Sequence, residues 1–417
     1  METSVTTTSR QSTTFTLVPL GLFLALLCVG FPSGLFDSYR DRFGFSTSVQ
    51  SLLFAVYAFT LVPALLCTPL ILRRTTPRGL YLIGTVALVL ADIVFLTAPN
   101  VLLLFVGRAV QGITVAFLNA AAPQILLDLQ RRRWGRFDPL VLALMTSAGL
   151  GLGLFGAKLL TGVSGDADRI LFALHLLLTL GFLVVAVVRR PPTGENPGTD
   201  TGSETGSDQA CTARRPQHLA AREEDHRTWN ALGGWAGATS WSLGGLFLGL
   251  GTVIGDAASP GLAAVVPFLF FVAMLVGQLA TRRITDISRA LRWGLGGSVV
   301  SAVATAGAVI VASDSPGAFS ATVAVLGSVI GGVSLGVVFV MATAVYERTT
   351  DPATEGPQTA VFFAKIFGGN SLPTLVVGVL TTAVGLNWSL TVLAAALAAA
   401  SGILVVRIRG LEVSDPR

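Results

Sequence analysis

Twelve apolar stretches of about 20 residues dominate this sequence, and they constrain its fold more than any other feature. A stretch of that length crosses a bilayer as a helix, because a helix satisfies all its backbone hydrogen bonds within itself. The alternating polar pattern of membrane β-barrel strands is missing from them. We therefore predict an all-α integral membrane protein with twelve transmembrane helices, near 15–36, 48–72, 79–98, 101–127, 139–162, 168–188, 229–254, 260–281, 290–313, 318–346, 358–382 and 386–406.

Charge supports the membrane prediction. Only 12% of the residues are charged, about half the share in a soluble domain, which excludes an ordinary soluble protein and a disordered one. Of the arginines, 22 fall on one side of the predicted spans and three on the other, at Arg40, Arg42 and Arg169. By the positive-inside rule, both termini are expected in the cytoplasm and the protein in the cell membrane. Because the arginines are dispersed over separate loops, we predict no nucleic-acid partner.

A polar segment at 191–228 divides the spans six and six. We predict an N-terminal six-helix bundle over 1–190, a cytoplasmic linker loop over 191–228 and a C-terminal six-helix bundle over 229–417. The halves form a pseudo-repeat, because Arg73-Arg74 after the second span recurs as Arg282-Arg283 after the eighth, at an offset of 209. Repeated halves typically place a substrate site at their interface near the midplane, and their rocking alternates access to it.

Two local motifs add to the pattern of spans. Gly107-Arg108-Ala109-Val110-Gln111-Gly112 in the fourth span contains RxxQG, and Arg73, Arg74, Arg78 and Gly79 match part of a GxxxDxxGRR loop whose acid is missing here. With the twelve spans, these motifs resemble the major facilitator superfamily of secondary transporters. The glycines of the fifth span are similar to the family's glycine-rich antiporter signature, although its Gly-Pro is Gly153-Leu154 here. The segment Gly368-Gly369-Asn370-Ser371-Leu372-Pro373 is similar to a broken eleventh span in bacterial drug and metabolite efflux permeases. The resemblance implies that Arg108 takes part in proton coupling or substrate binding.

Ionisable residues inside a membrane span are costly, so each is a candidate for function. Arg108 lies about 12 Å deep in the fourth span, on one helical stripe with Gln111 and Asn119. It either faces a substrate cavity or forms a structural pair. Asp37, where the first span meets the outer loop, either carries a proton in the cavity or pairs with a nearby arginine. Asp92 either pairs with Arg108 as a proton-responsive latch or has a purely structural pair.

Three further ionisable side chains have a plain structural alternative. Lys365 either extends towards the inner headgroups or acts as a cation in the cavity, Lys158 is expected to extend towards the outer surface, and His175 is expected to be a hydrogen-bonded structural residue. Trp241 is the favoured pocket aromatic, because an indole offers an apolar face and one N–H donor.

Proline and glycine mark two predicted breaks in the helices. Pro32 and Gly34 are expected to interrupt the first span, and Gly369 and Pro373 to form a hinge in the eleventh. Both positions are candidates for gating, since freed backbone groups are tolerated where protein or water satisfies them.

Together these features predict a membrane transporter that moves a small organic solute by alternating access, with proton-coupled efflux of a drug or metabolite as the leading function. The alternative is proton-coupled uptake of a small, possibly anionic, nutrient. An enzyme is not expected, because no metal set and no positioned nucleophile and base appear in the spans. We predict no cofactor and no metal, a proton gradient as the energy source, and a monomer whose partners are the solute, protons and the lipid bilayer.

Overall fold

The computed structural model describes residues 2–131, 138, 140–188, 217–315, 317–349 and 355–414. Most of the predicted linker, 191–216, lies outside these residues, so the predicted division into bundles stays a prediction. The last part of the predicted linker belongs to a helix, because α7 begins at Gln217.

The described residues contain twelve helices that are long and apolar enough to cross a membrane, which confirms the predicted fold class. No strand occurs among them. A short 3-10 turn, Thr281–Arg283, follows α8. The helices are α1 Glu2–Phe43, α2 Thr47–Leu72, α3 Pro77–Thr97, α4 Val101–Arg131, α5 Leu140–Thr161, α6 Ala167–Val188, α7 Gln217–Ala258, α8 Val265–Ala280, α9 Ile287–Asp314, α10 Ala318–Thr349, α11 Glu355–Val384 and α12 Leu386–Ser414.

Local sequence explains where several helices begin. The side chains of Ser46, Thr76 and Asp286 each accept a hydrogen bond from a backbone N–H of the first turn, at the start of α2, α3 and α9. Gly44 and Gly261 have φ of 67° and 86° and stand in the turns before α2 and α8. Glycine adopts this left-handed conformation without a Cβ clash, so each set of six helices has such a turn between its first two members.

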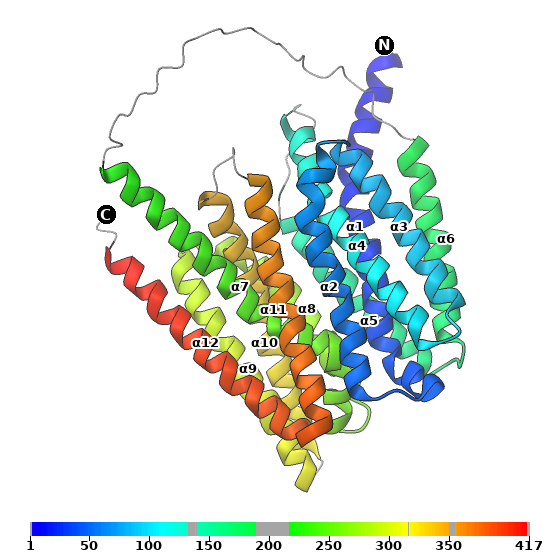
Figure 1. The fold of residues 1–417 in the computed structure, drawn as a ribbon, viewed down its shortest axis with the longest axis vertical. Coiled ribbons are helices and arrows are strands. Elements are labelled where there is room, and N and C mark those ends of the chain that lie inside the picture. The colour runs from blue at the N-terminus through cyan, green and yellow to red at the C-terminus, as the bar shows by residue number, and fades with distance from the viewer. Residues whose placement is uncertain are drawn as a thin grey trace.

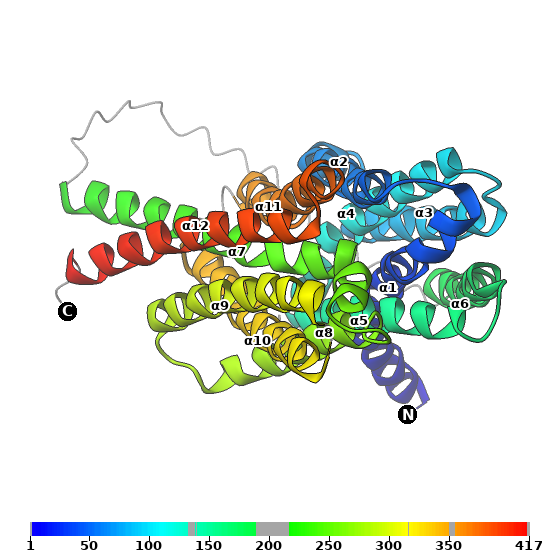
Figure 2. The same ribbon diagram turned by 90° about the horizontal axis from the view of Figure 1, so that it is seen from below.

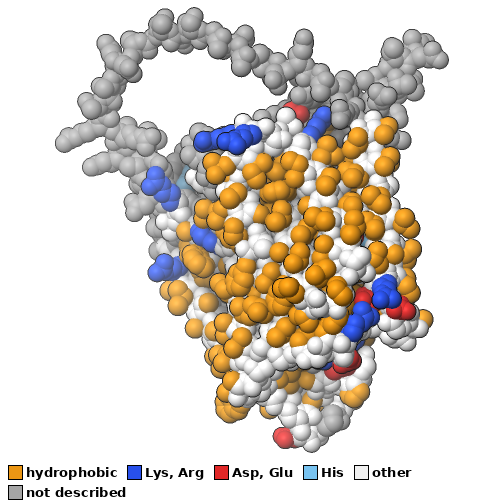
Figure 3. Space-filling view, turned by 45° about the vertical axis from the view of Figure 1, so that its right-hand side comes forward, with side chains coloured by type: hydrophobic (Ala, Val, Ile, Leu, Met, Phe, Trp, Pro, Cys, Tyr) orange, Lys and Arg blue, Asp and Glu red, His pale blue; other side chains and the backbone are white. Residues whose placement is uncertain are grey.

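The helices form two sets that stand side by side, α1–α6 and α7–α12, as Figures 1 and 2 show. We call the end of the molecule where α1 begins and α12 ends the termini side, and the opposite end the far side. In the face seen in Figure 3, hydrophobic side chains cover the middle, and charged side chains gather towards the two ends. Large apolar side chains such as Leu177 and Val184 are exposed, as expected of a surface that contacts lipid.

The two sets meet mainly where α5 lies beside α8 and where α2 lies beside α11. Between α5 and α8, contacts extend from the stacked rings of Phe155 and Phe268, 4.1 Å apart, to the ion pair of Asp138 with Arg282 on the termini side. Between α2 and the C-terminal set, the hydrogen bonds of the described residues lie on the far side. Ser48 Oγ is 2.8 Å from Thr382 Oγ1, and Gln50 Nε2 donates to the carbonyl oxygen of Gly249 at 3.0 Å. The far side is thus held shut at α2.

Candidate functional site

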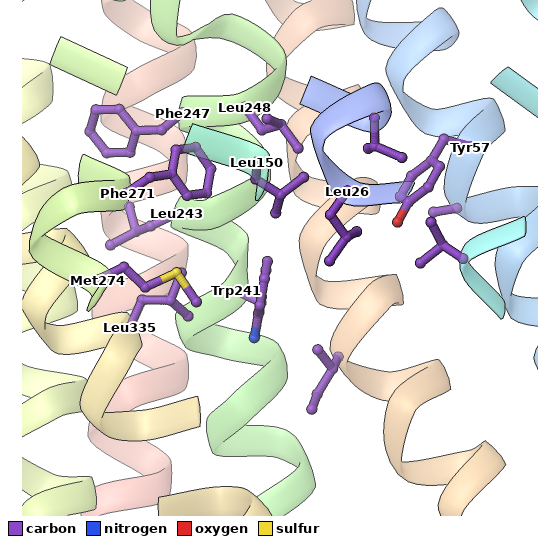
Figure 4. Packing of buried hydrophobic residues seen from close by; sticks show 14 of the residues in the cluster. Leu26, Tyr57, Leu150, Trp241, Leu243, Phe247, Leu248, Phe271, Met274 and Leu335 are labelled. Atoms are coloured by element: carbon purple, nitrogen blue, oxygen red, sulfur yellow. The ribbon is translucent and has the colours of Figure 1, made fainter. Parts of the chain in front are cut away.

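A pocket lies between the two sets of helices. Its lining comes from α1, α2, α4 and α5 on one side and from α7, α10 and α11 on the other: Leu26, Tyr57, Asn119, Thr146, Leu150, Trp241, Leu248, Phe339, Phe363, Ile366, Phe367 and Asn370. Figure 4 shows three of the lining residues, Leu26, Leu150 and Trp241, each on a different helix. None of these lining residues is charged. The structure therefore brings predicted site residues Trp241 and Asn119 together in an apolar pocket.

Two polar atoms beside this pocket lack a hydrogen-bond partner. They are Nε1 of Trp241, an N–H donor, and Oδ1 of Asn370, an acceptor, and both are buried. An unpaired buried polar atom costs about 1–3 kcal/mol, so both atoms favour a bound molecule that supplies the missing partners. The indole ring is held edge-on to Phe339, with ring centroids 5.5 Å apart. Asn119 differs, because its amide already donates to the Val115 carbonyl at 3.0 Å.

The pocket is small in this conformation. Its cavity volume is about 30 Å³. One water needs about 10–15 Å³ by this measure, so the pocket has room for a few waters and not for an organic solute.

Arg108 lies outside this pocket, fully buried between α4 and α1. Its Nη1 donates to the carbonyl oxygen of Val29 at 3.1 Å and to Gln111 Oε1 at 3.2 Å, and its Nη2 donates to Ser33 Oγ at 3.4 Å. The guanidinium also lies over the ring of Phe36, 5.3 Å from its centroid. No described carboxylate is within ion-pair distance, so the alternative in which Asp92 pairs with Arg108 is wrong. Arg108 is a buried cation held by neutral groups.

Pro32 explains part of this arrangement. A proline has no N–H, so the carbonyl four residues earlier, that of Cys28, lacks its helical donor. Gln111 fills the gap, because its Nε2 donates to the Cys28 carbonyl oxygen at 3.0 Å. The predicted break in this span is therefore wrong: α1 is one helix through Pro32. Gly34 serves close packing, since a Cβ there would lie 2.3 Å from the Leu154 carbonyl oxygen of α5.

Asp92 belongs to a second buried cluster, formed by α1, α3 and α6. Its two carboxylate oxygens are 2.9 and 2.8 Å from Nδ1 of His175, and Cys28 Sγ donates to one of them at 3.2 Å. Nε2 of His175 is 3.0 Å from the Leu24 carbonyl oxygen. The expectation of a hydrogen-bonded His175 is confirmed. The role of Cys28 could not be foreseen, because no sequence spacing connects it to Asp92 or His175.

Ligand atoms of Cys28, Asp92 and His175 lie within 4.8 Å of one another, which raises the question of a metal site. Around tetrahedral zinc, a nitrogen and an oxygen ligand stand roughly 3.3 Å apart, given metal–ligand distances near 2.0–2.1 Å. The separation of 2.8 Å between His175 Nδ1 and Asp92 Oδ2 is that of a hydrogen bond. The geometry fits a proton between these two side chains and not a metal ion.

Asp37 pairs with Arg40, as one of its two alternatives predicted, whereas Lys158 differs from expectation. The first helix extends to Phe43, so Asp37 lies inside α1 and not at the start of a loop. Its carboxylate pairs with Lys158 of α5 and, at 3.0 Å, with Arg40. Lys158 is thus an ion-pair partner and does not extend freely towards the outer surface. Neither residue lines the pocket, so Asp37 fastens α1 to α5.

The remaining predicted positions lie away from the pocket lining. Lys365 places its ammonium 5.7 Å from the ring centroid of Trp235, which is about half exposed. Gly369 packs against α7, since a Cβ there would lie 2.2 Å from the Ala238 carbonyl oxygen. Pro373 is inside α11, which continues unbroken to Val384.

The arginine-rich loop lies on the termini side, between α2 and α3. Arg73 and Arg74 are exposed there, and Arg78 and Gly79 belong to the first turn of α3. Thr76 caps this turn by accepting a hydrogen bond from the Gly79 N–H at 3.1 Å.

Comparison with known proteins agrees with the architecture. A sequence model of the Major Facilitator Superfamily matches residues 19–230. No curated protein sequence matches the chain. Among solved structures, a mutant of the nucleoside transporter NupG is similar with a TM-score of 0.65 at 13% identity, covering 95% of this chain and 99% of that one. NupG itself gives a TM-score of 0.64 at 10% identity, with 94% and 98% covered. At these identities, the similarity concerns the fold alone.

Proposed function

The chain belongs to the major facilitator superfamily of secondary transporters, and on this basis we propose that it exports a small, uncharged or weakly polar organic solute in exchange for protons. The solute binds between the two sets of helices, which rock around it. Drugs and secondary metabolites with a large apolar surface are the class that this site suits best.

The pocket carries this proposal. Its described lining is uncharged, and it offers one unpaired donor at Trp241 and one unpaired acceptor at Asn370. An apolar body bearing one acceptor and one donor would satisfy both atoms and bury its surface against the rings around them. Uptake of an anionic nutrient is the weaker candidate, because Arg108 and Lys365 are not among the lining residues.

The proposed orientation in the membrane rests on the charge distribution. The arginine-rich loops favour a cytoplasmic termini side in the cell membrane. With that orientation, the hydrogen bonds from Ser48 and Gln50 close the outer end, and the pocket lies inside this closure. A solute could then reach the pocket from the cytoplasm, as export requires at its start.

A ligand screen followed by transport tests the proposal. Purified full-length protein is heated with a panel of apolar and amphipathic compounds, because a compound that binds the folded state raises its melting temperature. The compound with the largest effect is then followed in proteoliposomes under an imposed pH difference. We expect the compound to move across the membrane in the direction opposite to the proton flow. Stabilisation by anionic metabolites alone, or transport that is indifferent to the pH difference, would contradict the proposal.

A further inference from the structure

We infer that Asp92 and His175 together hold one proton inside the N-terminal set of helices, and that this proton is the one exchanged for the solute. The inference rests on the proposed proton coupling. It places the coupling site on α3 and α6, away from the solute pocket.

Hydrogen bonding requires the proton. The Leu24 carbonyl oxygen can only accept, so the Nε2 that faces it at 3.0 Å carries a hydrogen. Nδ1 faces both carboxylate oxygens of Asp92, and a bare nitrogen would not stand 2.8 Å from a bare carboxylate. Either the imidazole is charged and the carboxylate ionised, or both are neutral and the acid donates. The pair holds one exchangeable proton and no net charge in both forms.

The surroundings of the Asp92–His175 pair disfavour a net charge on it. His175 and Asp92 are 1% and 0% exposed. The ring of Phe31 meets the imidazole edge-on at 5.4 Å. A second proton would leave a net positive charge here, and loss of the first would leave a net negative charge. Burial disfavours a second proton strongly, and it disfavours loss of the first unless a cation comes close to the carboxylate.

The polar and charged groups facing the pair come from three helices. Cys28 of α1 donates to the carboxylate, and Thr179 of α6 is 3.3 Å from Nδ1. Behind Cys28 stands α4, whose Gln111 donates to the sulfur at 3.2 Å and accepts from Arg108 at 3.2 Å. A continuous chain of hydrogen bonds thus connects the pair to a buried cation that has no acid of its own.

Through this chain of hydrogen bonds, loss of the proton would affect the position of Arg108. While the pair is neutral, Arg108 rests on the Val29 carbonyl and Ser33, as observed. Once the proton leaves, the pair becomes negative and attracts the guanidinium across α1. The guanidinium of Arg108 would then leave the Val29 carbonyl and the Ser33 hydroxyl, which lie beside Pro32 on α1. Proton release would therefore change how α4 is held against α1, next to the helices that line the pocket.

Nitrogen-15 NMR on histidine-labelled, full-length protein in nanodiscs tests the proton directly. Replacing His218 and His226 with Gln leaves His175 as the single labelled ring. We expect Nε2 to report an attached hydrogen and Nδ1 to report a shared one, and Asp92→Asn to shift the Nδ1 signal to that of an acceptor. Asp168→Asn is the matched control, because this buried acid of α6 pairs with Arg42. An Nδ1 signal that is the same with and without the Asp92 carboxylate would overturn the inference.

Transport assays then distinguish a failure of this inference from a failure of the proposed function. With the compound identified by thermal stabilisation, Asp92→Asn and His175→Gln should keep compound exchange across proteoliposomes and lose transport driven by a pH difference. The double variant guards against a folding defect in either single one. If wild-type transport ignores the pH difference, proton coupling itself fails. If wild type responds and Asp92→Asn responds equally, the assignment to this pair fails.

Discussion

Gln111 of α4 donates its side-chain amide to the carbonyl oxygen of Cys28 of α1, 3.0 Å away. The same side chain accepts from Arg108 and donates to the Cys28 sulfur, so one amide joins the buried cation to the proton-bearing pair. Because Pro32 cannot supply the helical donor for that carbonyl, the contact replaces a backbone hydrogen bond with one between helices.

Replacing Gln111 with Leu is expected to destabilise the protein. The change leaves the Cys28 carbonyl unpaired in an apolar interior and removes one acceptor from Arg108, a loss of about 1–3 kcal/mol for each unpaired group. Gln124→Leu is the control on the same helix, since its amide bonds only to the Ala120 carbonyl of α4. Thermal unfolding in detergent compares them, and equal melting temperatures for both variants would contradict the role of Gln111.

The Asp92–His175 pair should show strong energetic coupling. Replacing either residue with Leu removes one partner of a buried pair, which costs about 3–5 kcal/mol. Replacing both leaves an apolar contact with no uncompensated group, so the double variant should melt above either single variant. A double-mutant cycle from thermal unfolding measures this coupling. Additive effects of the two substitutions would show that the two side chains act independently.

Arg108→Gln should separate binding from transport. The guanidinium is buried against α1 and is not among the pocket residues, so the stabilising compound should raise the melting temperature of this variant as in wild type. Transport should fall, because the proposed attraction between Arg108 and the deprotonated pair is lost. Loss of stabilisation by the compound, in a variant that still folds, would instead place Arg108 in contact with the solute.

Trp241→Phe tests the pocket. It keeps an aromatic face and removes the Nε1 donor, so a compound with a matching acceptor should bind about tenfold more weakly, as expected for one hydrogen bond of about 1.4 kcal/mol. Trp235→Phe is the control, since that ring is on the same helix, about half exposed and outside the pocket lining. Equal affinities of the two variants, measured by titration calorimetry, would remove Trp241 from the binding site.

The glycine pair of α11 offers a matched test of the predicted hinge. A Cβ on Gly369 would lie 2.2 Å from the Ala238 carbonyl oxygen, whereas one on Gly368 would meet nothing within 4 Å. Gly369→Ala should therefore lower the melting temperature and slow transport, because α11 must move away from α7 to make room for the added methyl group. Gly368→Ala should leave both unchanged, and a transport defect in Gly368→Ala alone would indicate that backbone freedom, not packing, matters here.

The fold could be predicted from sequence because bilayer thickness sets the length of every span, and because arginine marks the loops. The pocket could be predicted in part. Trp241 and Asn119 stand out as polar or aromatic groups in apolar surroundings, whereas Tyr57 and Phe339 look like any lipid-facing or core residue. Which face of a helix meets the opposite set depends on the rotation of that helix, and one sequence does not fix it.

The buried cluster of Cys28, Asp92 and His175 could not be predicted from the sequence for the same reason. Asp92 and Arg108 are the obvious opposite charges on adjacent helices, and pairing them is the simplest hypothesis. In the structure, α3 turns Asp92 towards α6, and His175 takes the place of the arginine. Cys28, Asp92 and His175 come from three helices, so only their packing brings these side chains together.

Alternating access is the central claim, and a reversible lock on the far side tests it most directly. Ser48→Cys with Thr382→Cys places two thiols where the hydroxyls lie 2.8 Å apart, in a background with Cys67 and Cys211 replaced by Ser. Oxidation should stop transport of the stabilising compound in proteoliposomes, and reduction should restore it, while each single cysteine variant stays active. Undiminished transport with the cross-link formed would show that the far side does not open, and would contradict the mechanism.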